Sequence, residues 1–196
     1  MEKNYEERKQ NTLAFFKAYQ LHLPLQDGEE NESFGDLKTS GAVVPPDPYD
    51  EELAEGQIRV LPGTERITYV ALLQKWGDDA YVVAPFSAHR HPATDEEFKP
   101  DYDGGCLQHV LQLWNVRTLQ NKTLKKSWCS GELPEADRQD ALAVWRWTLN
   151  GGELEERLLQ KTGLPVYKQD DPRLEYKQDE LQNFAAVDAA DLALLE

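Results

Sequence analysis

Three short apolar runs between Gly56 and Ser87 form the most regular pattern in the chain. The runs are residues 58–61, 67–73 and 80–86. β-Branched and aromatic residues predominate in all three, and Pro62-Gly63-Thr64 and Gly77-Asp78-Asp79 separate them with residues typical of turns. Connections this short join only antiparallel neighbours, so the pattern predicts a β-meander. Because two hairpins bury too little surface to be stable alone, they need at least one more covering layer, and we expect a small, strongly bent antiparallel barrel or half-barrel.

The rest of the chain predicts one added strand and several helices. Residues 106–116 are apolar again with imperfect alternation, which predicts a fourth strand pairing back onto the meander. Helical spacing of apolar residues predicts helices over residues 2–21, 153–162 and 179–196, and a further helix with Pro134 in its first turn that stops at Asn150-Gly151-Gly152. The fold class is therefore α+β, with a barrel flanked by an N-terminal helix and a C-terminal helical cap. The expected divisions are residues 1–24 (helix), 25–55 (acidic linker or loop), 56–131 (barrel) and 132–196 (cap).

The apolar faces of the terminal helices can be assigned from the same spacing. In the first helix the stripe is expected to include Leu13, Phe16 and Tyr19, with Tyr5 and Thr12 further back, so that these side chains pack on the core. In the last helix the shared face is expected to be Leu181, Phe184, Leu192 and Leu195. Trp145 and Trp147 project to opposite sides of their helix, so one is expected in the core and the other at the surface.

Composition narrows the classes of function. The chain has 36 acidic and 21 basic residues, a net charge of −15, and this charge opposes a general affinity for nucleic acid or anionic membranes. No run approaches the roughly 18 apolar residues of a membrane span, and the charged N-terminal residues do not form a secretory signal. Two cysteines without a CxxC pair favour reduced thiols in a cytoplasmic protein. There is no glycine-rich phosphate loop or nucleophile elbow, so no cofactor is expected.

Residues 104–131 contain no acidic residue and form a basic island in this acidic chain. The island combines cations with aromatic residues: Trp114, Arg117, Lys122, Lys125, Lys126 and Trp128. Such a combination suits the docking of an acidic protein partner, or phosphate contact with base stacking. It also suits simple compensation of the protein's own acidic loops. All three interpretations stay open at this stage.

His89 and His91 form the second candidate site. Residues two apart on an extended strand face the same way, so both imidazoles could bind one metal ion, with Cys106, His109 or Asp95 as a further ligand. Pro92 interrupts the strand and no partner pair at a fixed spacing follows. The alternative is a solvated turn with no metal.

Residues 56–87 resemble the opening of PemK/MazF-type toxins. The similar segments are Gly56-Gln57-Ile58-Arg59-Val60, Arg66-Ile67-Thr68-Tyr69-Val70 and Val83-Ala84-Pro85-Phe86-Ser87. The resemblance implies an SH3-like barrel, and it would match Arg66 to the catalytic arginine of that family and Ser87 to its catalytic hydroxyl residue.

Two functions follow as expectations. The first is a non-enzymatic interaction or regulatory module that binds a protein partner. The surface of this partner that contacts residues 104–131 is expected to be acidic. The alternative is a toxin-like ribonuclease or RNA-binding barrel that uses Arg66 and Ser87. The acidic balance of the chain disfavours RNA as a substrate.

Overall fold

The computed structural model describes residues 2–20, 52–64, 66–102 and 108–194. The strands are β1 (Gln57–Leu61), β2 (Thr68–Trp76), β3 (Ala80–Pro85), β4 (Glu97–Phe98), β5 (Leu111–Gln112), β6 (Arg117–Gln120) and β7 (Trp128–Glu132). The helices are α1 (Glu2–Gln20), the 3₁₀ turn η1 (Leu113–Asn115), α2 (Asn121–Leu124), α3 (Glu135–Asn150), α4 (Glu156–Leu159) and α5 (Pro172–Leu192). The mixed α+β class expected from the sequence is confirmed.

The main sheet has the strand order β6-β3-β2-β1-β7, and every pairing is antiparallel. The meander β1-β2-β3 forms as predicted, with Val60 opposite Tyr69 and Leu72 opposite Val83. Gly63 and Gly77 have positive φ angles of 85° and 62° in the two hairpin turns, which explains why glycine stands there. Local turn chemistry and β-branched runs therefore determine this part of the fold.

The fourth strand predicted within residues 106–116 forms only in part: Leu111 makes an antiparallel bridge to Phe86 at the end of the third apolar run, and the Ser87 N–H donates to the Val110 carbonyl at 2.8 Å. In the described part of that range only Leu111 and Gln112 form a strand, and they pair with β4 in a separate two-stranded sheet. The next residues, Leu113–Asn115, turn as a 3₁₀ helix that buries Leu113. The two remaining strands of the main sheet are instead β6 and β7, which lie in the basic island except for Glu132 at the end of β7.

The sheet does not close into a barrel, so that expectation is also corrected. β6 and β7 are the outer strands, and the described residues show no pairing between them. Helix α5 supplies the physical reason, because the backbone N–H of Gln120 in β6 donates to the Asp191 carboxylate of α5 at 3.0 Å. Arg117 of β6 binds Asp188 of the same helix. Side chains of α5 thus bind the outer edge of β6, where a closing strand would otherwise form its hydrogen bonds.

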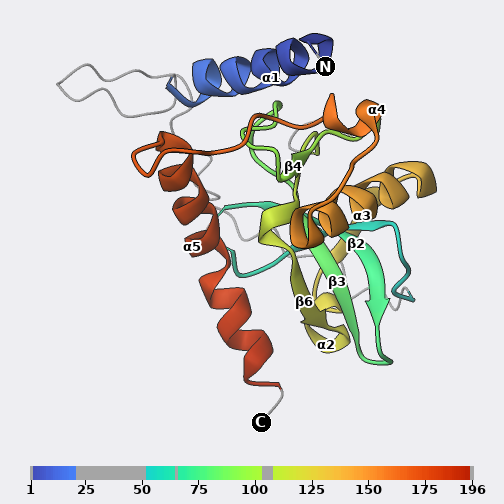
Figure 1. The fold of residues 1–196 in the computed structure, drawn as a ribbon. Helices are drawn as coiled ribbons and strands as arrows, with labels where there is room; N and C mark the ends of the chain where they lie inside the picture. Colours follow the sequence, from blue (N-terminus) through green and yellow to red (C-terminus); the bar gives the residue numbers. More distant parts are fainter. Residues whose placement is uncertain (1, 21–51, 65, 103–107, 195–196) are drawn as a thin grey trace, which may run out of the picture.

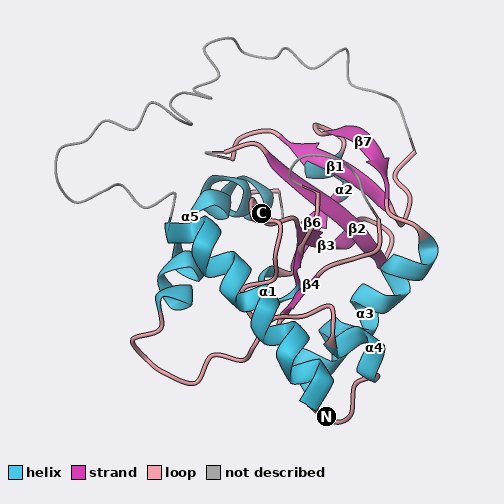
Figure 2. Cartoon of the chain, turned by 90° about the horizontal axis from the view of Figure 1, so that it is seen from above, coloured by secondary structure: helices cyan, strands magenta, loops and turns pink. Residues whose placement is uncertain are grey.

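Both faces of the sheet are buried, which makes the sheet the middle layer of the molecule. Successive β2 residues alternate between two apolar clusters, with Val70 and Leu72 in one and Ala71 and Leu73 in the other. The first cluster includes Phe184 of α5, and the second includes residues of α3. Figure 2 shows α5 and α3 on opposite sides of the sheet.

Helix α1 lies across one end of this layered body, at the top of Figure 1. Its buried residues are Phe15 and Thr12, whereas Leu13, expected in the core, is 51% exposed. Thr12, which the helical spacing places on the inward stripe, is held there because its hydroxyl accepts the Leu164 N–H at 2.9 Å. Arg8 adds a bond from Nε to the Gly163 carbonyl at 2.9 Å.

Helix α5 begins earlier than predicted. Asp171 caps it by accepting the Arg173 N–H at 3.0 Å, and Pro172 occupies its first turn. The expected apolar face is wrong in part, since Leu181 and Leu192 are 41% and 63% exposed while Phe184 is buried. The buried face is instead rich in polar residues: Arg173, Tyr176, Glu180, Asn183, Phe184, Val187 and Asp191.

Three further expectations have outcomes in the structure. Trp145 and Trp147 are both half-buried and pack against the same apolar cluster, so the prediction of one core and one surface tryptophan is wrong. The acidic linker predicted for residues 25–55 lies outside the described residues except at its end, 52–55. None of the described helices is both long and apolar enough to span a membrane.

Candidate functional site

The structure divides the basic island into residues used inside the fold and residues left at the surface. Arg117 contacts Asp188 with Nε at 2.9 Å and lies 4.2 Å from the centre of the Phe184 ring. Trp114 donates its indole N–H to Glu97 at 3.2 Å. These two side chains therefore connect separate parts of the fold. For Arg117, the contact with Asp188 supports the interpretation that the island compensates the protein's own acidic residues.

The lysine turn, which we define as Lys122, Lys125 and Lys126, is the exposed part of the island. Its backbone is fixed by Leu124, which is fully buried in the cluster under α5, and by the Asn121 N–H, which donates to the Asp79 carbonyl at 2.7 Å. Because Leu124 points inward, the three lysines are directed to the surface. None of them is within 4 Å of a carboxylate in the part of the chain that the structure describes.

Trp128, the remaining island residue, starts β7 opposite Val60 of β1. Its side chain is half-buried, so it offers part of its ring at the surface. The island thus contributes three exposed lysines, whereas Trp114, Arg117 and Trp128 are partly buried, so the six residues do not form one exposed surface.

Arg66 and Ser87 line the same small cavity, so the structure brings together the two residues that the toxin resemblance singles out. The cavity holds about 30 Å³, which is room for about one water molecule and not for a nucleotide. Arg66 is engaged by α5, because its Nη2 lies 3.2 Å from Glu180 Oε1 and its backbone N–H donates to Asn183 at 2.9 Å. A buried carboxylate beside Arg66 also disfavours a phosphate at this position.

Ser87 is only 1% exposed, and its hydroxyl is fully engaged. It accepts the His89 N–H at 3.0 Å and lies 2.9 Å from the Tyr176 hydroxyl. Tyr176 donates its own proton to Glu97 at 2.8 Å, so the Ser87 hydroxyl is the donor toward Tyr176. Burial raises the pKa of Tyr176 well above its ordinary value, and a protonated phenol cannot act as the base that would activate a serine.

Glu97 is the centre of this buried network. It accepts hydrogen bonds from the Ala93 N–H at 2.5 Å, from Trp114 and from Tyr176, and it is 0% exposed. Burial raises its pKa, against the opposing effect of these donors. Perturbed carboxyls often mark active sites, but this one is closed off from any substrate. Its contacts join the turn before β4, the η1 turn and helix α5.

We expect Glu97→Gln to change how stability depends on pH. Because burial raises the pKa of Glu97 above 4.5 in the folded state, the folded chain holds this proton more tightly than the unfolded chain does. The stability from this group is complete below the unfolded pKa and is lost as pH rises through the folded pKa. Glutamine does not ionise, so the unfolding free energy of the variant, relative to the original protein, should rise as the pH increases above the unfolded pKa of a glutamate.

Urea denaturation at a series of pH values measures this difference. The matched control is Glu175→Gln, which removes an exposed carboxyl from the first turn of α5. Identical pH profiles for the two variants would show that Glu97 ionises in the folded protein as it does in water.

His89 and His91 do not come together as a metal site. The His89 ring packs against Phe15 and Tyr176, with ring centres 4.9 and 5.4 Å away. The pKa of His91 is lowered, first by burial and then by Lys99 and Arg90. Among the residues that the structure describes, no group of three or more His, Cys, Asp or Glu side chains could hold a metal ion, and Cys106 lies outside them.

The arrangement of the candidate residues thus favours a surface function over a buried catalytic one. Ser87, Glu97 and Arg117 serve internal contacts, whereas the lysine turn is presented outward on a fixed piece of backbone. Comparison of the chain with protein-family models, with curated proteins and with solved structures found no match.

Proposed function

We propose that this chain is a non-enzymatic protein-binding module that docks an acidic protein partner through the lysine turn. The observation that carries the proposal is the contrast within the basic island. Arg117 has an internal carboxylate partner, but Lys122, Lys125 and Lys126 have none among the described residues. Compensation of the protein's own negative charge therefore explains the presence of Arg117. It does not explain the three lysines, which we assign to the binding of an external partner.

Electrostatics favour a protein over a nucleic acid as that partner. At physiological ionic strength, charges are screened beyond about 8 Å, so a local cationic turn can attract a matching acidic patch despite the net charge of −15. A long polyanion would also approach the acidic remainder of the surface and be repelled. Lys177 lies over the Trp114 ring, 4.9 Å from its centre, and occupies a face that base stacking would need.

We also propose that the main sheet is strongly curved, and the length of one connection supports this. Residues 121–127 alone connect β6 to β7, the two outer strands, through the single turn of α2. In a flat sheet those strands would lie about 19 Å apart. So short a link supports a strongly curved, open, SH3-like half-barrel. The proposal also places the protein in the cytoplasm, in keeping with the free thiol of Cys129.

Affinity capture from native extract tests the proposed function. We expect the protein to recover a defined acidic partner, and the triple variant Lys122→Glu/Lys125→Glu/Lys126→Glu to lose at least about tenfold in recovery because three attractions become repulsions. The matched control reverses three exposed cations elsewhere, Arg90, Lys99 and Lys168, and should retain capture. Rising salt should weaken capture by the original protein. Equal recovery of the same partner by both triple variants would contradict the proposal.

One observation favours the ribonuclease-like alternative, namely that Arg66 and Ser87 line a common cavity. If this reading is correct, the protein cleaves single-stranded RNA and Arg66→Ala abolishes cleavage. Absence of cleavage by the original protein, or equal cleavage by the variant, removes the alternative without affecting the proposal of a binding module.

A further inference from the structure

A groove of about 500 Å³ lies beside the C-terminal end of α3, in a part of the molecule that none of the sites above uses. Residues from three separate segments line it: Trp147 and Thr148, Asp95 and Glu96, Pro165 and Val166. Helix α3, the turn before β4 and the segment that leads to α5 therefore meet at this point. The groove is large enough to accept a long side chain with part of its backbone.

Two features of α3 make the groove attractive to a cation. Trp147 donates its indole N–H to the Gly152 carbonyl at 3.1 Å, which fixes the orientation of the ring. Gly151 ends the helix at a positive φ of 69°, and it lines the groove together with Thr148. The last carbonyls of a helix carry partial negative charge, and the face of an indole attracts cations.

The acidic pair adds full charges that the protein itself compensates only in part. Glu96 binds Lys177 through Oε2, and its side chain is still 40% exposed. The pKa of Asp95 is raised, first by burial and then by repulsion from Glu96. Arg8 and Lys177 favour the ionised form of Asp95, but they do not outweigh these two effects. A cation entering the groove would therefore relieve an existing electrostatic penalty.

We propose that this groove binds an arginine side chain presented by a peptide segment of a protein partner. A guanidinium is flat and weakly hydrated, so it can stack on the Trp147 indole while its parallel N–H groups donate to a carboxylate. Lysine offers a compact, strongly hydrated charge that fits the aromatic wall less well. This site is distinct from the lysine turn, and the inference does not depend on the function proposed above.

A titration followed by the indole N–H resonance of Trp147 tests the inference, with the resonance assigned by Trp147→Phe. The probe is the capped peptide acetyl-Gly-Arg-Gly-amide, compared with the same peptide carrying neutral citrulline or lysine in place of arginine. We expect a saturable shift with a millimolar Kd for the arginine peptide, no saturable shift for citrulline, and weaker binding for lysine. Asp95→Asn should raise the Kd about fivefold or more, because it removes a charged acceptor while keeping the side-chain shape.

Controls separate this site from the rest of the surface. Glu153→Gln, which removes an exposed acid just after α3, should leave the Kd unchanged, as should the triple reversal of the lysine turn. Circular dichroism of Asp95→Asn confirms that the fold is kept. A citrulline peptide that binds as well as arginine, an unchanged Kd in Asp95→Asn, or no saturable shift up to about 20 mM peptide would each overturn the inference. Equal binding of the lysine peptide would overturn the choice of arginine.

Discussion

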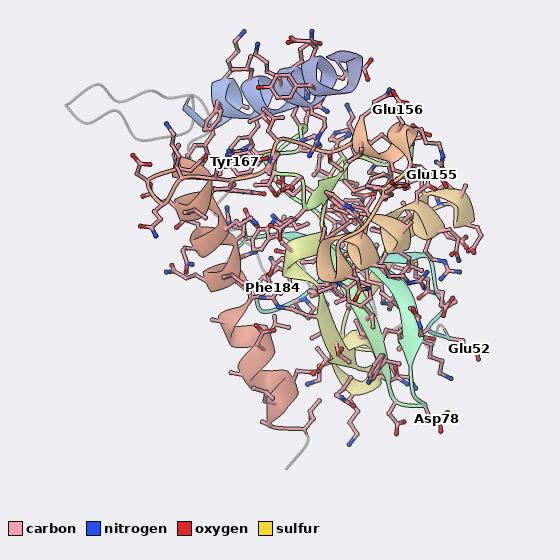
Figure 3. All side chains as sticks on the ribbon, viewed as in Figure 1. Glu52, Asp78, Glu155, Glu156, Tyr167 and Phe184 are labelled. Carbon is pink, nitrogen blue, oxygen red and sulfur yellow. The ribbon has the colours of Figure 1, made fainter. Side chains whose placement is uncertain are left out.

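Phe184→Ala is expected to lower the free energy of unfolding by about 3–5 kcal/mol, which is the usual cost of truncating a fully buried phenylalanine. Phe184 is 0% exposed and packs from α5 into the cluster that contains Leu72, Val83 and Leu124. Figure 3 labels it on the side of α5 that faces the sheet. The Arg117 guanidinium lies over the Phe184 ring. The variant therefore creates a cavity and also removes the aromatic partner of this cation.

Urea denaturation and thermal unfolding measure the effect, which should appear as a decrease of roughly 6–20 °C in Tm for a chain of this size. The matched control is Leu181→Ala, on the same helix but 41% exposed, which should cost less than about 1 kcal/mol. If both variants were equally mild, α5 would not be packed on the sheet as the structure shows.

Gly163→Ala is expected to destabilise the protein by about 3 kcal/mol, at the upper end of the usual cost of overpacking. A Cβ at this position would lie 2.8 Å from three backbone atoms, in Pro92, Ala93 and Thr94. Backbone atoms in a packed turn cannot rotate away as a side chain can, so the turn and the segment after α4 must separate. Arg8 of α1 binds the Gly163 carbonyl, so the change should also loosen α1.

Hydrogen exchange of the α1 amides, together with urea denaturation, checks both parts of this prediction. The control is Gly63→Ala, where no atom lies within 4 Å of the added Cβ and the cost of about 1–2 kcal/mol comes only from the positive φ of 85°. Selective acceleration of exchange in α1 should occur with Gly163→Ala alone. Full protection of α1 in that variant would show that the helix is held independently of this contact.

The agreement between sequence and structure is best where local interactions decide the conformation. Hairpin turns at Gly63 and Gly77 and the runs around Val70 and Val83 predict the meander correctly, because turn geometry and β-branched side chains act over a few residues. Helix α3 (Glu135–Asn150) forms where it was predicted, although Pro134 caps it and does not lie in its first turn, and it ends at the predicted stop at Gly151, for the same reason.

Expectations about which face a helix buries fail where polar residues are satisfied by distant partners. Asn183 of α5 faces inward because its side-chain amide donates to the Thr68 hydroxyl, far away along the chain. Leu181, which the apolar spacing assigns to the core, remains exposed on α5. Periodicity records only hydrophobicity, so it cannot recognise a buried face that is built from paired polar groups.

The sequence by itself determined the antiparallel meander, the main helices and the presence of a cationic segment in an acidic chain. Only the tertiary structure decided which cations of that segment serve internal contacts among the described residues, because Asp188 and Phe184 of α5 engage Arg117 while the lysine turn stays at the surface. It also decided that Trp147 and Asp95 line one groove, and that Ser87 is enclosed. Spacing along the chain governs local geometry, whereas burial and ion pairing depend on contacts between residues far apart in sequence, and those exist only once the chain has folded.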